Sequence, residues 1–326
     1  MLSNNTTLSS SSCASIDLVT VNVAISYLYF LLFPVAFLLN GVAMWVCLHL
    51  RSTSTFIVYL KNLVASDLLM VLTLPPMAAS RLPGAAELRA FDCRYSRVIF
   101  YCCLYTSIAL MGLISLERFF KIVKPGGKVL GQTVAFSLLM STFVWVVLFG
   151  TTGVPAIILT DQDPVNITEA FCMSLKSPAG LTLHKYSVLS MEIFFWLVSI
   201  LSVFCYITLK VLQSFRNSGS SNSHGKKKTK LRVFLILLVF FICFVPLHVT
   251  RIPFTLNEIF DIDDCTQTWV IIVHKFVLWV STTDACLDPL FYTHLCREYK
   301  DILLDMMKAR GIGVGSYSGE GEGSSQ

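Results

Sequence analysis

The sequence has few charged residues. Only 14% of its 326 residues are Asp, Glu, Lys or Arg, whereas 55% are hydrophobic. A soluble domain carries roughly a quarter charged residues, so water is not the main solvent of this surface. This shortage of charge excludes a soluble enzyme, a nucleic-acid-binding domain and a disordered chain. The mean hydropathy of +0.69 agrees, and the length fits several apolar spans joined by short loops.

The first twenty residues lack the basic start and apolar run of a cleavable signal peptide. Seven long apolar runs follow, near residues 23–48, 56–80, 91–123, 133–159, 186–212, 231–256 and 269–293. They are predicted to be helices, because backbone groups in lipid must find hydrogen-bond partners within the segment. No internal repeat is present, so an inverted-repeat transporter has no support and a transporter or channel stays a remote alternative. The sequence predicts an all-α membrane protein built as a seven-helix bundle.

Positive charge is concentrated on one side of the predicted spans. Residues 210–232 hold seven Lys and Arg residues and no acid, and further basic residues follow the third and seventh spans. Because basic loops stay cytoplasmic, an odd number of spans places the N-terminus outside. The glycosylation sequons at Asn4, Asn5 and Asn166 then all lie on the outer side. We expect a multi-pass plasma-membrane protein with an extracellular N-terminus.

Four parts are expected along the chain. Residues 1–22 form an extracellular glycosylated N-terminus and residues 23–296 form the seven-helix domain. Residues 297–310 carry apolar side chains on one side of a helix, which is typical of a segment lying on the inner leaflet. Residues 311–326 lack core-forming side chains and are predicted to be a disordered cytoplasmic tail. Cys296, at the inner boundary, is a candidate for palmitoylation.

Four of the 11 cysteines fall on the predicted outer side: Cys13, Cys93, Cys172 and Cys265. Four cysteines allow three pairings, and the outer face is oxidising. Cys93 lies at the outer start of the third span and Cys172 in the long loop after the fourth, which favours a bond between them. Cys13 would then join Cys265. Four free thiols are the alternative.

Three carboxylates lie at membrane depth, where ionisable residues indicate function. Asp67 is in the middle of the second span, and Asp284 and Asp288 share a face of the seventh. If they approach one another and Ser107, they cannot all be ionised without a cation. The prediction is a site for a sodium ion or for shared protons, with no other metal or cofactor. The alternative is that Asp67 and Asp288 only hydrogen-bond neighbouring helices.

Cations and aromatic rings gather on the outer half of the spans. They are Arg97, Tyr101 and Tyr105 on the third span, Lys176 and His184 before or at the fifth, His248 and Arg251 on the sixth, and His274 and Lys275 on the seventh. Arg and Lys bind phosphate or carboxylate and Tyr stacks on a base, so this set suits an anion that carries a flat ring. Snorkelling at the headgroups is the alternative. It explains Lys176 well, but not Arg251, which lies inside a span with no acid nearby in sequence.

At the cytoplasmic end of the third span, Glu117 and Arg118 are adjacent and opposite in charge. Such a pair can hold a helical bundle in one conformation, and breaking it allows a second conformation. Pro246 supplies a bend in the sixth helix about which the inner end could pivot.

Several motifs resemble the span signatures of rhodopsin-like G-protein-coupled receptors. In order, they are Asn40 in LLNGVAMW, Asp67 in VASDLL, Cys93, Glu117-Arg118-Phe119, Trp145, Cys243-Phe244-Val245-Pro246 and Asp288-Pro289-Leu290-Phe291-Tyr292. The finer strings CRYSRVIFY, LISLERFFKIVKP, LKSPAGLTLHK, FFICFVPLHVTRIPFT and ACLDPLFY resemble the metabotropic purinoceptors. They are most similar to the branch that senses ADP and UDP-sugars and couples to Gi.

The resemblance implies roles for individual residues. Tyr101, Tyr105, Lys176, His184, His248 and Arg251 match ligand contacts, and the pairs Cys93–Cys172 and Cys13–Cys265 match two disulfides. It implies that Arg118 engages the G protein and that Tyr206 and Tyr292 rearrange with it. Four positions depart from the pattern. Phe254 stands where a tyrosine is common, and Val198 stands at the usual proline of the fifth span, as in other members of this branch. His274, followed by Lys275, stands where adenine-nucleotide receptors carry a lysine, and Asp284 replaces a usual asparagine.

The expected function is therefore that of a receptor and not an enzyme. It would bind an extracellular anionic ligand, a nucleotide or nucleotide sugar, and signal through Gi to inhibit adenylyl cyclase. The alternative within the same branch is a lysophospholipid-sensing or constitutively active orphan receptor. The expected partners are the anionic ligand, a heterotrimeric G protein and membrane lipids, with no nucleic acid.

Overall fold

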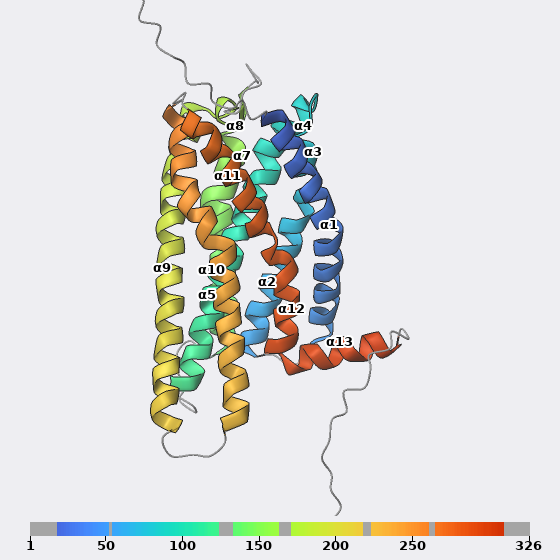
Figure 1. Cartoon of the computed structure of the whole chain (residues 1–326), viewed down its shortest axis with the longest axis vertical. Helices are drawn as coiled ribbons and strands as arrows, with labels where there is room; N and C mark the ends of the chain where they lie inside the picture. Colours follow the sequence, from blue (N-terminus) through green and yellow to red (C-terminus); the bar gives the residue numbers. More distant parts are fainter. Residues whose placement is uncertain are drawn as a thin grey trace, which may run out of the picture.

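The protein is a bundle of long helices. A computed structural model describes residues 18–51, 54–123, 133–162, 171–217, 223–260 and 265–309, and every regular element within these ranges is helical. Seven segments in the described part are long and apolar enough to cross a membrane. They stand side by side, with α13 lying across one end (Figure 1). This confirms the predicted seven-helix membrane fold.

Each predicted span corresponds to one helix or to consecutive helices. In chain order the spans are α1 (Leu18–His49); α2 (Thr55–Leu72) with α3 (Leu74–Ala79); α4 (Ala86–Phe91), η1 (Asp92–Ser96) and α5 (Arg97–Val123); α6 (Val134–Trp145), η3 (Val146–Gly153) and α7 (Val154–Ile158); α9 (Pro178–Asn217); α10 (Ser223–Phe260); and α11 (Cys265–Thr282) with α12 (Asp284–Leu295). The short α8 (Phe171–Ser174) precedes α9, and α13 (Arg297–Ala309) ends the described chain.

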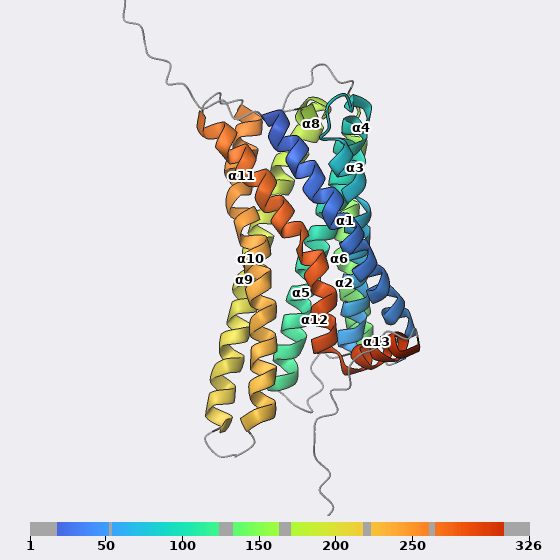
Figure 2. The same cartoon turned by 45° about the vertical axis from the view of Figure 1, so that its right-hand side comes forward.

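Several helices are longer than the apolar runs that predicted them. Helix α1 begins at Leu18 rather than near residue 23, and α9 begins at Pro178 rather than near residue 186. Helices α9 and α10 extend beyond the other spans at the end where α13 lies (Figures 1 and 2). The reason is that a run of apolar residues marks only the part of a helix that lies in lipid, whereas the backbone hydrogen bonds continue beyond the lipid into polar surroundings.

Local sequence explains the helix starts and interruptions. The side chains of Ser54 and Thr133 accept hydrogen bonds from the backbone N–H groups of Ile57 and Phe136, so they cap α2 and α6. Prolines at the first turn of α3 separate it from α2. Thr283 separates α11 from α12, so that α12 begins at Asp284 in the middle of the seventh span.

Helix α13 packs across the end of the bundle (Figure 2). Its Tyr299 is buried, with its ring 5.9 Å from that of Tyr292, and Glu298 accepts a hydrogen bond of 2.9 Å from the backbone N–H of Arg51. The predicted helix is confirmed, and its contact with the inner leaflet stays a prediction. Cys296 is buried, so palmitoylation would require this junction to open.

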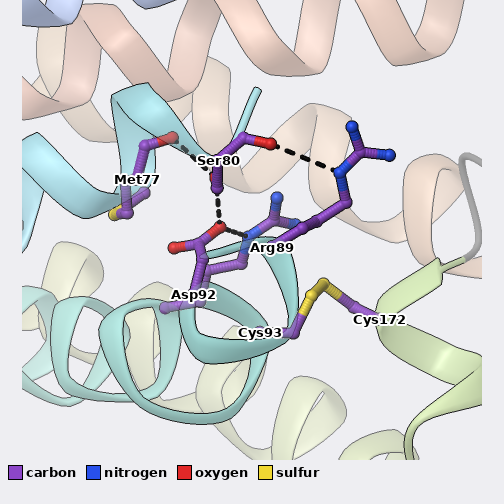
Figure 3. The surroundings of a disulfide bond; sticks show 7 residues. Met77, Ser80, Arg89, Asp92, Cys93 and Cys172 are labelled. Carbon is purple, nitrogen blue, oxygen red and sulfur yellow. Dashed lines mark hydrogen bonds and ion pairs between the residues drawn. A yellow bond between two sulfur atoms is a disulfide. The ribbon is translucent and has the colours of Figure 1, made fainter. Parts of the chain in front are cut away.

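The predicted bond between Cys93 and Cys172 is present and joins η1 to α8, with the Cα atoms 5.3 Å apart (Figure 3). The predicted bond between Cys13 and Cys265 cannot be placed, because residues 1–17 and the side chain of Cys265 lie outside the described part. The sequons at Asn4, Asn5 and Asn166 and the predicted tail at residues 311–326 also lie outside it.

Candidate ligand-binding site

A cavity opens between the helices at the end of the bundle that holds the disulfide. It encloses about 140 Å³ and is lined by η1, α5, α7, α8, α9, α10 and α11. The predicted ligand residues that line it are Arg97, Tyr101, Tyr105, Lys176, His184, Arg251 and His274. Among the described residues that line this cavity there are three Arg or Lys side chains and no Asp or Glu. The lining is therefore cationic and aromatic, as the sequence predicts.

Arg251, on α10, points into the bundle and not into lipid. Its side chain is 7% exposed. The guanidinium carbon lies 4.3 Å from the centre of the Tyr101 ring, and Nη1 donates a hydrogen bond of 3.1 Å to the Tyr105 hydroxyl. These contacts hold the guanidinium at the wall of the cavity, where its donors suit a carboxylate or phosphate group.

A directed chain of hydrogen bonds runs from Arg251 to the backbone of α10. His248 Nδ1 lies 2.8 Å from the Phe244 carbonyl oxygen and must donate to it, because a carbonyl can only accept. In the neutral ring Nε2 then accepts, so the Tyr105 hydroxyl, 3.0 Å away, donates to it. This leaves the lone pairs of Tyr105 to accept from Arg251. His248 therefore acts behind Tyr105, stacked on Phe195 at 3.6 Å, and does not line the cavity.

Arg97 is anchored by an acid that the sequence analysis does not identify. Its Nε donates to Asp92 Oδ2 at 2.8 Å. The hydroxyl of Ser80 donates to the same oxygen at 2.9 Å, as the labelled Ser80 and Asp92 show in Figure 3. Asp92 is fully buried. Its position directly before Cys93 is the sequence signal that could have found it, because a disulfide fixes the neighbouring residue in place.

The remaining predicted cations fall in two groups. His274 is buried against the cavity, with its ring stacked on that of Phe254 at 4.0 Å, and Lys176 and His184 line the cavity from the segment that enters α9. Lys275 is placed differently. Its Nζ donates a 2.8 Å hydrogen bond to Asn22 Oδ1 on α1, and it does not line the cavity. Consecutive helical residues point about 100° apart, which is why only one of this pair reaches the site.

A second acid missed by the sequence analysis lies below the cavity. Glu192, on α9, is 3% exposed, and neither carboxylate oxygen has a hydrogen-bond partner among the described residues. An acid within an apolar run is the same signal that selects Asp67, so Glu192 could have been found in the sequence.

The three predicted carboxylates come together in the middle of the bundle. Ser107 donates to Asp67 Oδ1 at 2.9 Å, and the Tyr292 hydroxyl donates to Asp67 Oδ2 at 2.9 Å and lies 3.3 Å from Asp288 Oδ2. Asp284 is buried one helical turn before Asp288, on the same face of α12. Because the Tyr292 hydroxyl has a single proton, the facing oxygen of Asp288 requires a proton or a cation of its own.

The donor atoms of this cluster suit a hard cation. All are oxygens, and Ser107 retains lone pairs while it donates to Asp67. Within the described residues no group of three or more His, Cys, Asp or Glu side chains is arranged as a metal site. A sodium ion would therefore have to be held by one or two of the carboxylates together with the hydroxyl of Ser107.

At the opposite end of the bundle, Glu117 and Arg118 form the predicted ion pair, with 3.6 Å between Arg118 Nε and Glu117 Oε2. Glu117 also accepts from Thr55 at 2.9 Å and pairs with Lys121. The Arg118 guanidinium lies 4.2 Å above the ring of Phe56. Three residues of the predicted switch lie outside this cluster: Tyr206 on α9, Pro246 within α10 and Tyr292 on α12. Their roles in activation stay predictions.

Comparison with known proteins agrees with this architecture. A model of the family described as "7 transmembrane receptor (rhodopsin family)" matches residues 39–292. Purinoceptor 14 of Bos taurus is 38% identical over 296 residues, covering 90% of this chain and 87% of that protein. Purinoceptor 13 of Homo sapiens is 37% identical over 287 residues, covering 87% and 81%. G-protein coupled receptor 87 of Mus musculus is 34% identical over 280 residues, covering 85% and 78%.

These relatives are receptors and not enzymes, which confirms the expected class of protein. The family model also spans the cationic cavity, the buried carboxylates and the Glu117–Arg118 pair. A multi-pass plasma-membrane protein that binds a small molecule and a G protein accounts for all three. The chain belongs to the rhodopsin family of seven-transmembrane, G-protein-coupled receptors and is of the purinoceptor type.

Proposed function

We propose that this receptor binds an extracellular anionic ligand that carries a flat ring, a nucleotide or a nucleotide sugar, and signals through Gi to inhibit adenylyl cyclase. The observation that carries the proposal is Arg251, a buried guanidinium at a cavity whose described lining holds cations and tyrosines but no acid. Arg binds phosphate through a fork of donors. The similarity to purinoceptors supports the nucleotide class. The basic residues of segment 210–232, at the end of α9 and the start of α10, support an extracellular N-terminus.

The ligand could transmit its binding through the chain from Arg251 to Phe244. An anion that draws the guanidinium toward itself weakens the bond to Tyr105, and Tyr105 in turn is bonded to His248. His248 is bonded to the backbone of α10 two residues before Pro246. A ligand shifts a conformational equilibrium only if it binds the two states differently. This chain is where such a difference would arise.

A ligand screen tests the proposal. In cells that express the receptor we expect ADP, UDP or UDP-glucose to lower forskolin-stimulated cAMP, and pertussis toxin to remove the response. Parental cells are the control. A response to lysophospholipids alone would favour the alternative ligand class, and a response that survives pertussis toxin would exclude Gi.

We further propose that sodium occupies the cluster of Asp67, Ser107, Asp284 and Asp288 and stabilises the inactive state. Replacing choline by sodium at constant ionic strength should raise the Tm of the purified receptor by about 2–4 °C. Asp67→Asn should remove this dependence, because it removes the carboxylate that Ser107 and Tyr292 orient. A flat sodium titration of the wild-type receptor would show instead that the carboxylates share protons.

A further inference from the structure

An acidic side chain faces the interior of the bundle from α9, below the ligand cavity. Val188, Glu192, Phe195 and Ser199 are all buried and lie on one face of this helix, whereas Leu189 and Ile193 between them are exposed. Val188 lines the cavity, and Phe195 stacks on His248. Along α9, Glu192 therefore lies between Val188, which lines the cavity, and Phe195, which stacks on His248.

The carboxylate of Glu192 is not satisfied by hydrogen bonds. Both oxygens are buried and have no hydrogen-bond partner among the described residues. A buried carboxylate in that condition is costly unless a nearby positive charge compensates it. Printed contacts aside, the chain of neighbours connects this part of α9 to Arg251. Phe195, one turn after Glu192, stacks on His248, and Tyr105 links His248 to the Arg251 guanidinium. Arg251 is therefore the positive charge that would act on Glu192, in agreement with the electrostatics of the site.

Arg251 would therefore face two anions once a ligand is bound. A guanidinium remains protonated at every physiological pH, so its charge is always available. Arg97 and Lys176 also line the cavity, but a ligand anion placed at Arg251 would share that guanidinium with Glu192. When the cavity holds no ligand, Glu192 is an internal counter-charge. When an anion enters, Glu192 repels it and shares the guanidinium with it.

We propose that Glu192 is an internal counter-charge that competes with the ligand for Arg251, lowers the affinity for anions and favours the less negatively charged among them. This rests on the proposed anionic ligand. Glu192 is thereby a specificity-determining residue that acts through Arg251, because it lies outside the described lining of the cavity. A ligand with more negative charge near Arg251 is repelled more strongly by Glu192.

The first arm of the test measures ligand affinity. Glu192→Gln removes the charge and keeps the shape of the side chain. We expect it to tighten binding of ADP roughly tenfold, which is within the usual range of coupling between two sites. Binding of UDP-glucose, which carries less negative charge than ADP, should tighten less. Glu87→Gln is the matched control, since Glu87 is exposed at the start of α4 and its loss changes the net charge equally.

The second arm uses the full-length receptor without ligand. The Tm is measured for Glu192→Gln, Arg251→Gln and the double variant. If the two charges compensate each other, each single variant leaves one buried charge uncompensated, and the double variant loses less than the sum of the two. Glu87→Gln combined with Arg251→Gln should be additive.

The two arms separate this proposal from the proposed function. Non-additive Tm changes together with tighter ADP binding by Glu192→Gln support the proposal. Additive Tm changes overturn it, and so does unchanged or weaker ADP binding by Glu192→Gln in a receptor whose wild type binds ADP. If the wild type binds neither ADP nor UDP-glucose, the nucleotide proposal fails and the competition with ligand fails with it, while the Tm cycle still decides whether Glu192 and Arg251 are coupled.

Discussion

Arg251→Ala should abolish the response to the anionic ligand while the receptor still reaches the cell surface. The side chain is buried, lies over the ring of Tyr101 and donates to Tyr105, so truncation removes the guanidinium that we propose binds the ligand. Truncating one member of a buried charge pair costs at least about 2 kcal/mol, which corresponds to a potency loss of at least about 30-fold. Dose–response curves for cAMP inhibition measure it.

Lys275→Ala is the matched control for this experiment. It removes one positive charge from the seventh span, next to the cavity residue His274. Lys275 itself contacts Asn22 and does not line the cavity. We expect its dose–response curve to stay near that of the wild type. Arg251→Lys should fall between the two, because it keeps the charge and loses the planar fork. An Arg251→Ala receptor with normal potency at normal surface expression would contradict the anion site.

Glu117→Gln should raise signalling in the absence of ligand. Glu117 is buried and holds Arg118, Lys121 and Thr55 together at the end of the bundle opposite the cavity. Neutralising it removes its attraction for both cations. If this costs the inactive state about 1.4 kcal/mol, the ratio of active to inactive receptor rises about tenfold. Basal inhibition of cAMP at matched surface expression measures the change.

Two further variants define what that result means. Lys121→Ala should raise basal signalling less than Glu117→Gln, because the Lys121 side chain is 43% exposed and water screens its charge, whereas Glu117 keeps its contacts with Arg118 and Thr55. Arg118→Ala should signal neither with nor without ligand if this arginine engages the G protein. A Glu117→Gln receptor with wild-type basal activity would show that the pair does not restrain the inactive state.

Much of the candidate site could be predicted from charged residues that lie inside apolar segments of the sequence. Arg251 and Asp67 stand out because a charge inside an apolar run is costly unless it has a function. The same argument applies to Glu192, whose signal in the sequence is as strong as that of Asp67. Asp92 is different. It lies near a predicted span boundary, where charge is common, so its place directly before Cys93 is a weaker signal than a charge inside an apolar run. Its burial against Ser80 and Arg97 is what distinguishes it in the structure.

The division between His274 and Lys275 has a different cause. Both are basic residues and adjacent in sequence, and apolar periodicity in a helix that is apolar on most sides does not say which of them faces inward. The packing of α11 against α10 and α1 decides it. His274 stacks on Phe254 of α10, and Lys275 reaches Asn22 of α1.

By itself, the sequence determined the class of fold, the number of spans and the set of polar residues that had to lie inside the bundle. The reason is that every span in lipid must hydrogen-bond its own backbone and keep charged side chains away from lipid, whatever the rest of the chain does. The tertiary structure alone decided which of those polar groups meet, for example Tyr105 with His248 and Arg251, and Ser107 with Asp67. Hydrogen bonds act over about 3 Å, so they depend on how the helices rotate and pack, which no single segment specifies.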